Sequence, residues 1–267
     1  GTDANGCVNA DDMTITVNPL PIVDAGPDET ICEGQSVQLQ ASGGSTYSWG
    51  PQNGLNNYAI SNPTFSGLNT TTYTVTSIDG NGCTDSDEIT ITVNTILPVD
   101  AGNDVTICFG ETVQLIASGA STYLWSPTAD LDNPNTPNPI FSGTSTTTLT
   151  VVGTDVNGCT NSDEIEIIVN PMPVIDAGND EAICIGDQIQ LTAAGAISYD
   201  WTPEADLDDP QIASPIFSGS NTTILTVTGT DVNGCSNSDD VTVTVNSLPI
   251  VDAGVDVDVC SGFSVQL

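Results

Sequence analysis

Carboxylates and thiols are the reactive side chains that dominate this sequence. Its 267 residues include 35 Asp and Glu and 8 Cys, but no Lys, Arg or His. Average usage would supply roughly 30 basic residues in a chain of this length. Their absence excludes Ser-His-Asp and Cys-His catalysis, a phosphate-binding lysine and a histidine-ligated zinc site. Among common mechanisms, only chemistry by paired carboxylates remains open.

The net charge of −35 restricts the partners of the chain. Nucleic-acid binding depends on Lys and Arg that neutralise phosphates, so we expect no nucleic-acid partner. Anionic membrane surfaces are disfavoured for the same reason. The sequence has no apolar run of 18 residues, and we therefore expect no membrane insertion.

The spacing of the cysteines reveals an internal repeat. The gaps between them alternate between 25 and 51 residues, which sum to a period of 76, and the three Trp residues keep the same period. We predict three complete repeats at 19–94, 95–170 and 171–246, with 1–18 as the end of a preceding repeat and 247–267 as the start of a following one. The sequence is thus expected to be a window on a longer array.

Within each repeat the residue pattern is that of β-strands. Apolar and polar residues alternate, β-branched residues are frequent, and Gly- and Asn-rich turns separate the segments. In the first repeat we predict strands at 20–31, 36–42, 46–50, 63–67, 71–79 and 87–94, with a short irregular strand within 54–60. Seven short strands with one Trp on the third predict an all-β chain of tandem immunoglobulin-like β-sandwiches, arranged head to tail as a rod.

Four linked motifs carry a resemblance to a known family. They are the runs PIVDAGPD at 21–28, VQLQASG at 37–43, YSW at 47–49, and YTVT at 73–76 followed by Asn81-Gly82-Cys83. They are similar to the PKD-like repeats of large surface adhesins from gliding bacteria. One departure is that Trp49-Gly50-Pro51 replaces the Trp-Asp-Phe-Gly-Asp-Gly motif of PKD domains. The resemblance implies an extracellular filament or adhesin on the bacterial cell surface, and it implies no catalysis.

Recurring cysteines in a surface protein predict disulfides. The pair Cys32 and Cys83 within one repeat conflicts with the expected strand order. Cys32 precedes the second strand and Cys83 follows the sixth, and these two strands run in the same direction. The two residues would lie at opposite ends of a sandwich about 30 Å long, whereas a disulfide needs Cα atoms within about 7 Å.

In a head-to-tail array, the turn before the second strand faces the turn after the sixth strand of the next repeat. This arrangement predicts the disulfides Cys32–Cys159 and Cys108–Cys235. Cys7, Cys83, Cys184 and Cys260 would then pair outside the window. The alternative is a bond within each repeat, which requires that one strand between the third and the sixth be missing.

Aspartates and asparagines also recur in register, and the expected fold brings four carboxylates of each repeat together near its N-terminal end. Oxygen ligands of this type suit Ca²⁺. The candidate ligands are Asp24, Asp28, Asp79, Asn81, Asp87, Asp100, Asp104, Asp155, Asn157, Asp163, Asp176, Asp180, Asp231, Asn233 and Asp239. In the alternative interpretation, these residues form turns, accept hydrogen bonds at strand ends and keep the surface soluble.

The sequence therefore favours a non-catalytic array that forms the shaft of an extracellular cell-surface filament or adhesin. Its expected partners are further copies of the repeat in the same chain, and also other filament chains or surface glycans. The alternative is an array of polysaccharide-binding modules beside an enzyme outside the window, with Tyr47 and Trp49 as a stacking platform. A Trp on the third strand of such a sandwich is more typical of the core.

Overall fold

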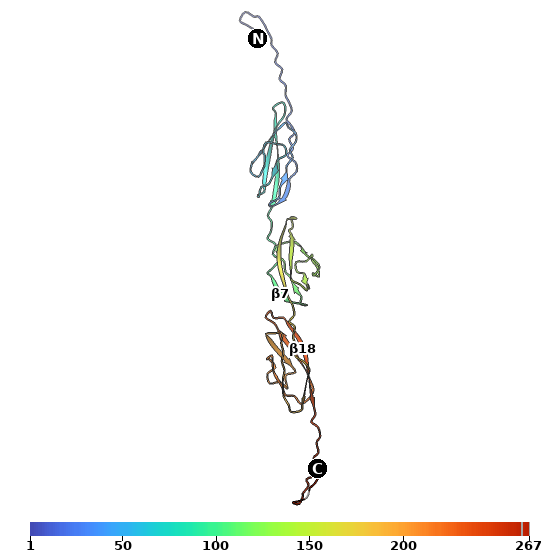
Figure 1. Cartoon of the computed structure of the whole chain (residues 1–267). Helices are drawn as coiled ribbons and strands as arrows, with labels where there is room; N and C mark the ends of the chain where they lie inside the picture. Colours follow the sequence, from blue (N-terminus) through green and yellow to red (C-terminus); the bar gives the residue numbers. More distant parts are fainter. Residues whose placement is uncertain (263, 267) are drawn as a thin grey trace.

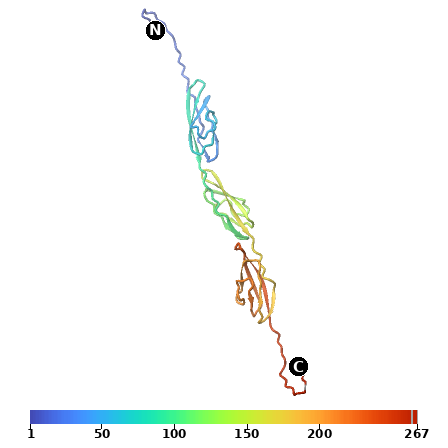
Figure 2. The same ribbon diagram turned by 60° about the vertical axis from the view of Figure 1, so that its left-hand side comes forward.

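The computed structural model describes residues 1–262 and 264–266. Three β-sandwiches follow one another along one axis, and the two ends of the chain lie at opposite ends of the rod (Figure 1). The view turned by 60° shows the same extended arrangement (Figure 2). The described residues form only strands, turns and loops, with no helix suited to cross a membrane. Positions 263 and 267 of the segment expected to start a further repeat lie outside the described residues.

Each sandwich has six strands in the same order. Those of the first are β1 (Glu29–Cys32), β2 (Val37–Gln38), β3 (Thr46–Gly50), β4 (Thr64–Phe65), β5 (Thr71–Ile78) and β6 (Thr84–Asn94). Those of the second are β7 (Val105–Cys108), β8 (Val113–Gln114), β9 (Thr122–Ser126), β10 (Ile140–Phe141), β11 (Thr147–Thr154) and β12 (Thr160–Asn170). Those of the third are β13 (Glu181–Cys184), β14 (Ile189–Gln190), β15 (Ser198–Thr202), β16 (Ile216–Phe217), β17 (Thr223–Thr230) and β18 (Ser236–Asn246).

Two sheets make up each sandwich. In the first, the larger sheet has the order β1-β6-β5-β3 and the smaller sheet pairs β2 with β4. Only β1 and β6 pair in parallel, with Cys32 opposite Asn94, and the other ladders are antiparallel. The parallel ladder places the end of β1 beside the end of β6, at the C-terminal end of the sandwich.

Several predicted strand bounds were wrong, since the strands expected at 63–67 and 87–94 are β4 (Thr64–Phe65) and β6 (Thr84–Asn94), and three others differ more. Of the strand expected at 20–31, only β1 pairs with another strand as a continuous ladder. The chain is interrupted before β1 because Gly26 adopts a φ of 87° and Pro27 has no N–H to donate. The expected strand at 36–42 forms a ladder with β4 only at Val37–Gln38, although Leu39 and Ala41 still donate their N–H groups to the carbonyls of Pro63 and Ser61. The short strand within 54–60 is reduced to one bridge between Leu55 and Phe65. The third strand, at 46–50, has the predicted bounds.

Each sandwich encloses its own hydrophobic core. Trp125 is fully buried on β9, and its indole N–H donates to the carbonyl oxygen of Thr136 at 3.1 Å. Trp49 and Trp201 occupy the same position in the other two sandwiches. The connecting residues 95–98 are exposed, so neighbouring cores do not merge. Contacts between sandwiches must therefore come from something other than a shared core.

Replacement of Trp125 by Ala should destabilise the second sandwich by about 3–5 kcal/mol, because the core loses its largest side chain and keeps a cavity. Leu124 is the adjacent residue on β9 and is 51% exposed, so Leu124→Ala should cost less than about 1 kcal/mol. Differential scanning calorimetry should show one of the three sandwiches melting early only in the Trp125 variant. Equal effects of the two substitutions would contradict this core.

Candidate functional site at the domain junctions

Disulfides join neighbouring sandwiches at both junctions. Cys32 bonds Cys159 and Cys108 bonds Cys235, each with Cα atoms 5.6 Å apart and a sequence separation of 127. These are the two pairs predicted from the strand order. The alternative, Cys32 with Cys83, is wrong, since β1 ends at one end of the sandwich and Cys83 directly precedes β6 at the other.

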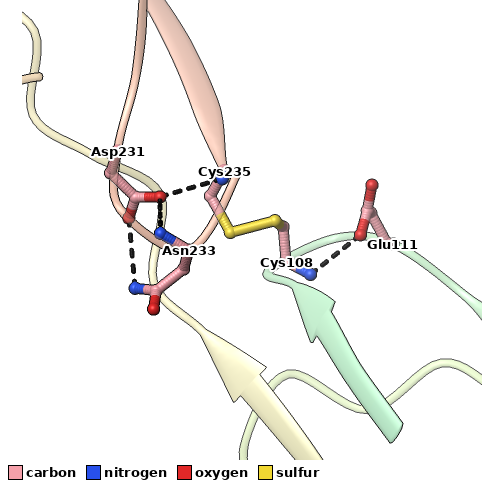
Figure 3. The surroundings of a disulfide bond; sticks show 5 residues. All are labelled: Cys108, Glu111, Asp231, Asn233 and Cys235. Atoms are coloured by element: carbon pink, nitrogen blue, oxygen red, sulfur yellow. Dashed lines mark hydrogen bonds between the residues drawn. A yellow bond between two sulfur atoms is a disulfide. The ribbon is translucent and has the colours of Figure 1, made fainter. Parts of the chain in front are cut away.

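One half of the junction is a short turn after β7. The Cys108 N–H donates to Oε2 of Glu111 at 2.8 Å, and the Glu111 N–H donates back to the Cys108 carbonyl at 3.0 Å. Phe109 donates its N–H to the carbonyl of Asn170, at the end of β12. Gly110 has a φ of 88°, which only glycine adopts readily. The turn thereby fixes the direction in which the Cys108 thiol points (Figure 3).

The other half is the turn between β17 and β18. Oδ1 of Asp231 accepts the N–H groups of Asn233 at 2.8 Å and Cys235 at 2.9 Å. The Asn233 side-chain amide donates to the second carboxylate oxygen at 3.4 Å. Figure 3 shows this carboxylate on one side of the disulfide and Glu111 on the other. Two carboxylates therefore hold the two cysteine backbones of one junction.

The Asp-centred turn forms from its own residues. At the start of the chain, Oδ1 of Asp3 accepts the N–H groups of Asn5 and Cys7, although residues 1–20 are exposed throughout. These bonds, that of Cys7 first, hold the pKa of Asp3 below its usual value. The Cys83 N–H lowers the pKa of Asp79 in the same way. The turn therefore presents its cysteine without support from a surrounding sandwich.

A side chain that the sequence prediction missed ties each linker to the following sandwich. Nδ2 of Asn161, on β12, donates to the carbonyl of Leu97 at 3.1 Å. Asn237 makes the same bond to Pro173 at 3.0 Å. The corresponding residue of the first repeat is Asp85, whose ionised side chain has no N–H to donate. Only the recurrence of Asn at this position could have indicated the role.

The predicted calcium ligands lie in turns, before the first strand, or within the long strand β6 and its equivalents, and each Asp carboxylate accepts a backbone N–H. Asp87 accepts from Ala25 at 2.8 Å, and this bond holds the pKa of Asp87 below its usual value. Asp163 and Asp239 make the equivalent bond. Three aspartates accept a backbone N–H from the last strand of their own sandwich, and they are Asp28, Asp104 and Asp180. The acceptors within a local turn are Asp24, Asp100, Asp176, Asp79, Asp155 and Asp231, and Asn81, Asn157 and Asn233 are donors in three of these turns.

The expected convergence of four carboxylates is not found. The carboxylates lie at successive positions along β6. Asp79 lies in the turn before this strand, Asp87 lies on it, and Asp28 accepts the N–H of Thr90 further along it. At about 3.3 Å per residue, the ladder spreads them over many ångströms. No group of three or more Asp, Glu, Cys or His suited to a metal ion occurs in the described part of the chain. Calcium binding stays a prediction.

Four cysteines have no disulfide partner among the described residues. They are Cys7, Cys83, Cys184 and Cys260. Cys83 occupies the turn position of Cys159 and Cys235, and Cys184 the position of Cys32 and Cys108. Their pairing with further repeats stays a prediction.

Three linked sandwiches with a buried Trp on the third strand define the class of this chain as tandem immunoglobulin-like domains. No family model and no curated protein matches it. Among solved structures, extracellular domains 3–5 of Drosophila OTK are 12% identical, with 85% of this chain and 95% of that one covered and a TM-score of 0.35. The I9–I11 tandem of titin is 14% identical, with 85% of this chain and 100% of that one covered and a TM-score of 0.33. The insect immune protein hemolin is 12% identical, with 85% of this chain and 76% of that one covered and a TM-score of 0.33. Such distant likenesses carry no argument about function.

The carboxylate of Asp231 should protect the Cys108–Cys235 disulfide from reduction, because it keeps the Cys235 turn closed. We expect Asp231→Ala to lower the dithiothreitol concentration at half-reduction about fivefold, the effect of losing roughly one net hydrogen bond. Asp79→Ala is the matched control, since it opens the same turn at the unbonded Cys83. Thiol alkylation followed by mass spectrometry gives the readout, and equal shifts in both variants would contradict the role of Asp231.

Calcium binding by the recurring aspartates predicts that a chelator lowers the melting temperature and that added Ca²⁺ restores it. Asp24→Asn and Asp87→Asn should weaken this response, since each removes a charge and keeps an acceptor oxygen for the backbone. Scanning calorimetry at physiological salt gives the measurement. Identical melting with Ca²⁺ and with chelator would leave these residues as hydrogen-bond acceptors only.

Proposed function

We propose that this chain is a non-catalytic stretch of an extracellular shaft, which separates a surface from whatever the end of the filament binds. The observation that carries the proposal is the covalent bond across each junction. Cores of separate sandwiches and exposed linkers would by themselves permit bending. A disulfide beside each linker restricts both bending and twisting of one sandwich against the next, which is a property that a shaft needs and a set of independent modules does not.

An extracellular location is supported by the same bonds, because disulfides persist in oxidising compartments and are rare in the cytosol. The bacterial cell surface, and membership of an adhesin of the PKD-like type, rest on the motif resemblance. In such a filament, the nearest partners are further repeats of the same chain, bonded through turns like those of Cys83 and Cys184.

The chemistry of the carboxylates supports a role without catalysis. In each repeat, the recurring aspartates accept backbone N–H groups in turns or across the sheet beside β6 and its equivalents. These are positions that hold the fold together, and the same positions recur in all three repeats. A catalytic pair would need two carboxylates that face one substrate.

The alternative of a polysaccharide-binding array loses its main candidate for a stacking surface. Trp49 is 2% exposed, and its indole N–H donates to the carbonyl of Ile60 within the sandwich. Tyr47 is half-buried and donates its hydroxyl to the carbonyl of Gly44. The Trp49 ring therefore presents no free face of the kind that sugar stacking uses, and the Tyr47 ring is partly packed against the core. Surface glycans remain candidate partners through other residues.

Deletion of residues 95–170 tests the shaft directly. The deletion removes one repeat and brings together Cys32 and Cys235, which belong to the two halves of a junction. We expect a shorter rod with a Cys32–Cys235 disulfide. A binding domain fused to the end of this rod should still bind a target at close range. Electron microscopy measures the length, and a glycan array on the intact chain is the opposing test. Specific glycan binding that the deletion weakens would favour the alternative.

Reduction should make the rod bend before it unfolds the sandwiches. The junctions lose their second covalent link, whereas each core keeps its buried side chains. Small-angle X-ray scattering should show a smaller maximum dimension with reductant, while circular dichroism changes little. The variant Cys108→Ser with Cys235→Ser should bend at one junction only. Scattering that is insensitive to reduction would remove the observation on which the proposed function rests.

A further inference from the structure

The disulfides change which residues form the shortest covalent path along the rod. Cys32 lies at the C-terminal end of the first sandwich, and its bond leads to Cys159 at the N-terminal end of the second. From Cys159 the chain follows β12 through the second sandwich and then β13 to the C-terminal end of the third, where it reaches Cys184. This path passes two sandwiches with a sequence separation of only 25 between Cys159 and Cys184.

A second path of the same kind starts at Cys83. It follows β6, the linker and β7 to Cys108, again 25 residues on, and crosses to Cys235 in the third sandwich. The two paths lie side by side in the second sandwich, where β7 and β12 pair in parallel. Every other strand of that sandwich belongs to neither path.

We propose that the two paths, which we call the rails, carry tension along the rod while the segments between them carry none. These segments, here called the bodies, are residues 33–82, 109–158 and 185–234. Each body contains the Trp strand and the long strand that pairs with it, such as β9 and β11. The inference rests on the proposed function, since only a shaft is pulled from its ends.

The rails are already close to their full length. The 11 residues of β12 span about 36 Å at 3.3 Å per residue, and a 25-residue step that passes two sandwiches reaches at most about 90 Å. Unfolding a body therefore adds little length while the disulfides hold. Without them, the 152 residues from Cys32 to Cys184 would extend to about 530 Å.

The alternation of cysteine gaps follows from this arrangement. The gap of 25 residues is one step of a rail, and the gap of 51 residues spans one body. Two continuous rails require a strictly periodic pair of cysteines, one directly before the last strand of a sandwich and one at the end of the first strand of the next. Further sandwiches bonded through Cys83 and Cys184 would lengthen both rails without a break.

The test is to pull the full chain in optical tweezers from Ser36 and Gln188, two exposed positions that bracket one rail. Azide-bearing residues at these positions take the handles, and Ser replaces the four unbonded cysteines to prevent thiol exchange. In the oxidised chain, we expect complete unfolding to add at most about 45 Å. After reduction, we expect it to add about 450 Å, a tenfold difference.

Two matched variants identify the bond responsible. Cys108→Ser with Cys235→Ser leaves the rail between the handles intact and should keep the short extension. Cys32→Ser with Cys159→Ser cuts this rail and should extend by several hundred ångströms. Long extension of the oxidised chain, or equal extension of the two variants, would overturn the rails. The result does not depend on where the protein functions, so a short extension in a protein found inside the cell would overturn only the proposed function.

Discussion

The parallel pairing of β1 with β6 is the constraint on which the rest of this architecture depends. It sets Cys32 opposite Asn94, so the thiol lies beside the point where the chain leaves the sandwich. An antiparallel first strand would end at the opposite pole, and its cysteine could not reach the next sandwich. The linker and the disulfide thus cross the junction together, so the exposed linker residues 95–98 are accompanied by a second covalent connection between sandwiches whose cores are separate.

The parts of this arrangement that could be predicted from sequence are those whose conformation is determined by residues close together in the chain. The turn around Asp231 carries its acceptor, its glycine and its cysteine within five residues, and the same turn closes at Asp3 without a sandwich around it. The order and direction of the strands follow from alternation and turns, and direction favoured the bond from Cys32 to Cys159 over the alternative within one repeat. Strand lengths were less accessible, because the pairing of residues such as Val37 with Phe65 depends on contacts distant in sequence.

The role of the aspartates could not be predicted for a similar reason. Recurrence shows that a carboxylate is needed, but it does not show whether the partner is a cation or a backbone N–H. The partner of Asp87 is Ala25, which lies 62 residues away and is brought to it by the packing of the first strand region against β6. Asn161 escaped notice because its partner is a linker carbonyl, and any residue there would supply one.

Charge gives these bonds a second consequence. The chain has a net charge of −35 and no side-chain cation, so carboxylates repel one another wherever they approach within about 8 Å at physiological salt. Hydrogen bonds from the backbone stabilise individual carboxylates such as Asp79, as the lowered pKa indicates, but they do not cancel the charge between sandwiches. Repulsion between neighbours favours a straight rod and opposes close contact at the junction. The disulfide supplies the attachment that apolar packing or ion pairs provide in less acidic tandem proteins, and it does so without a basic residue.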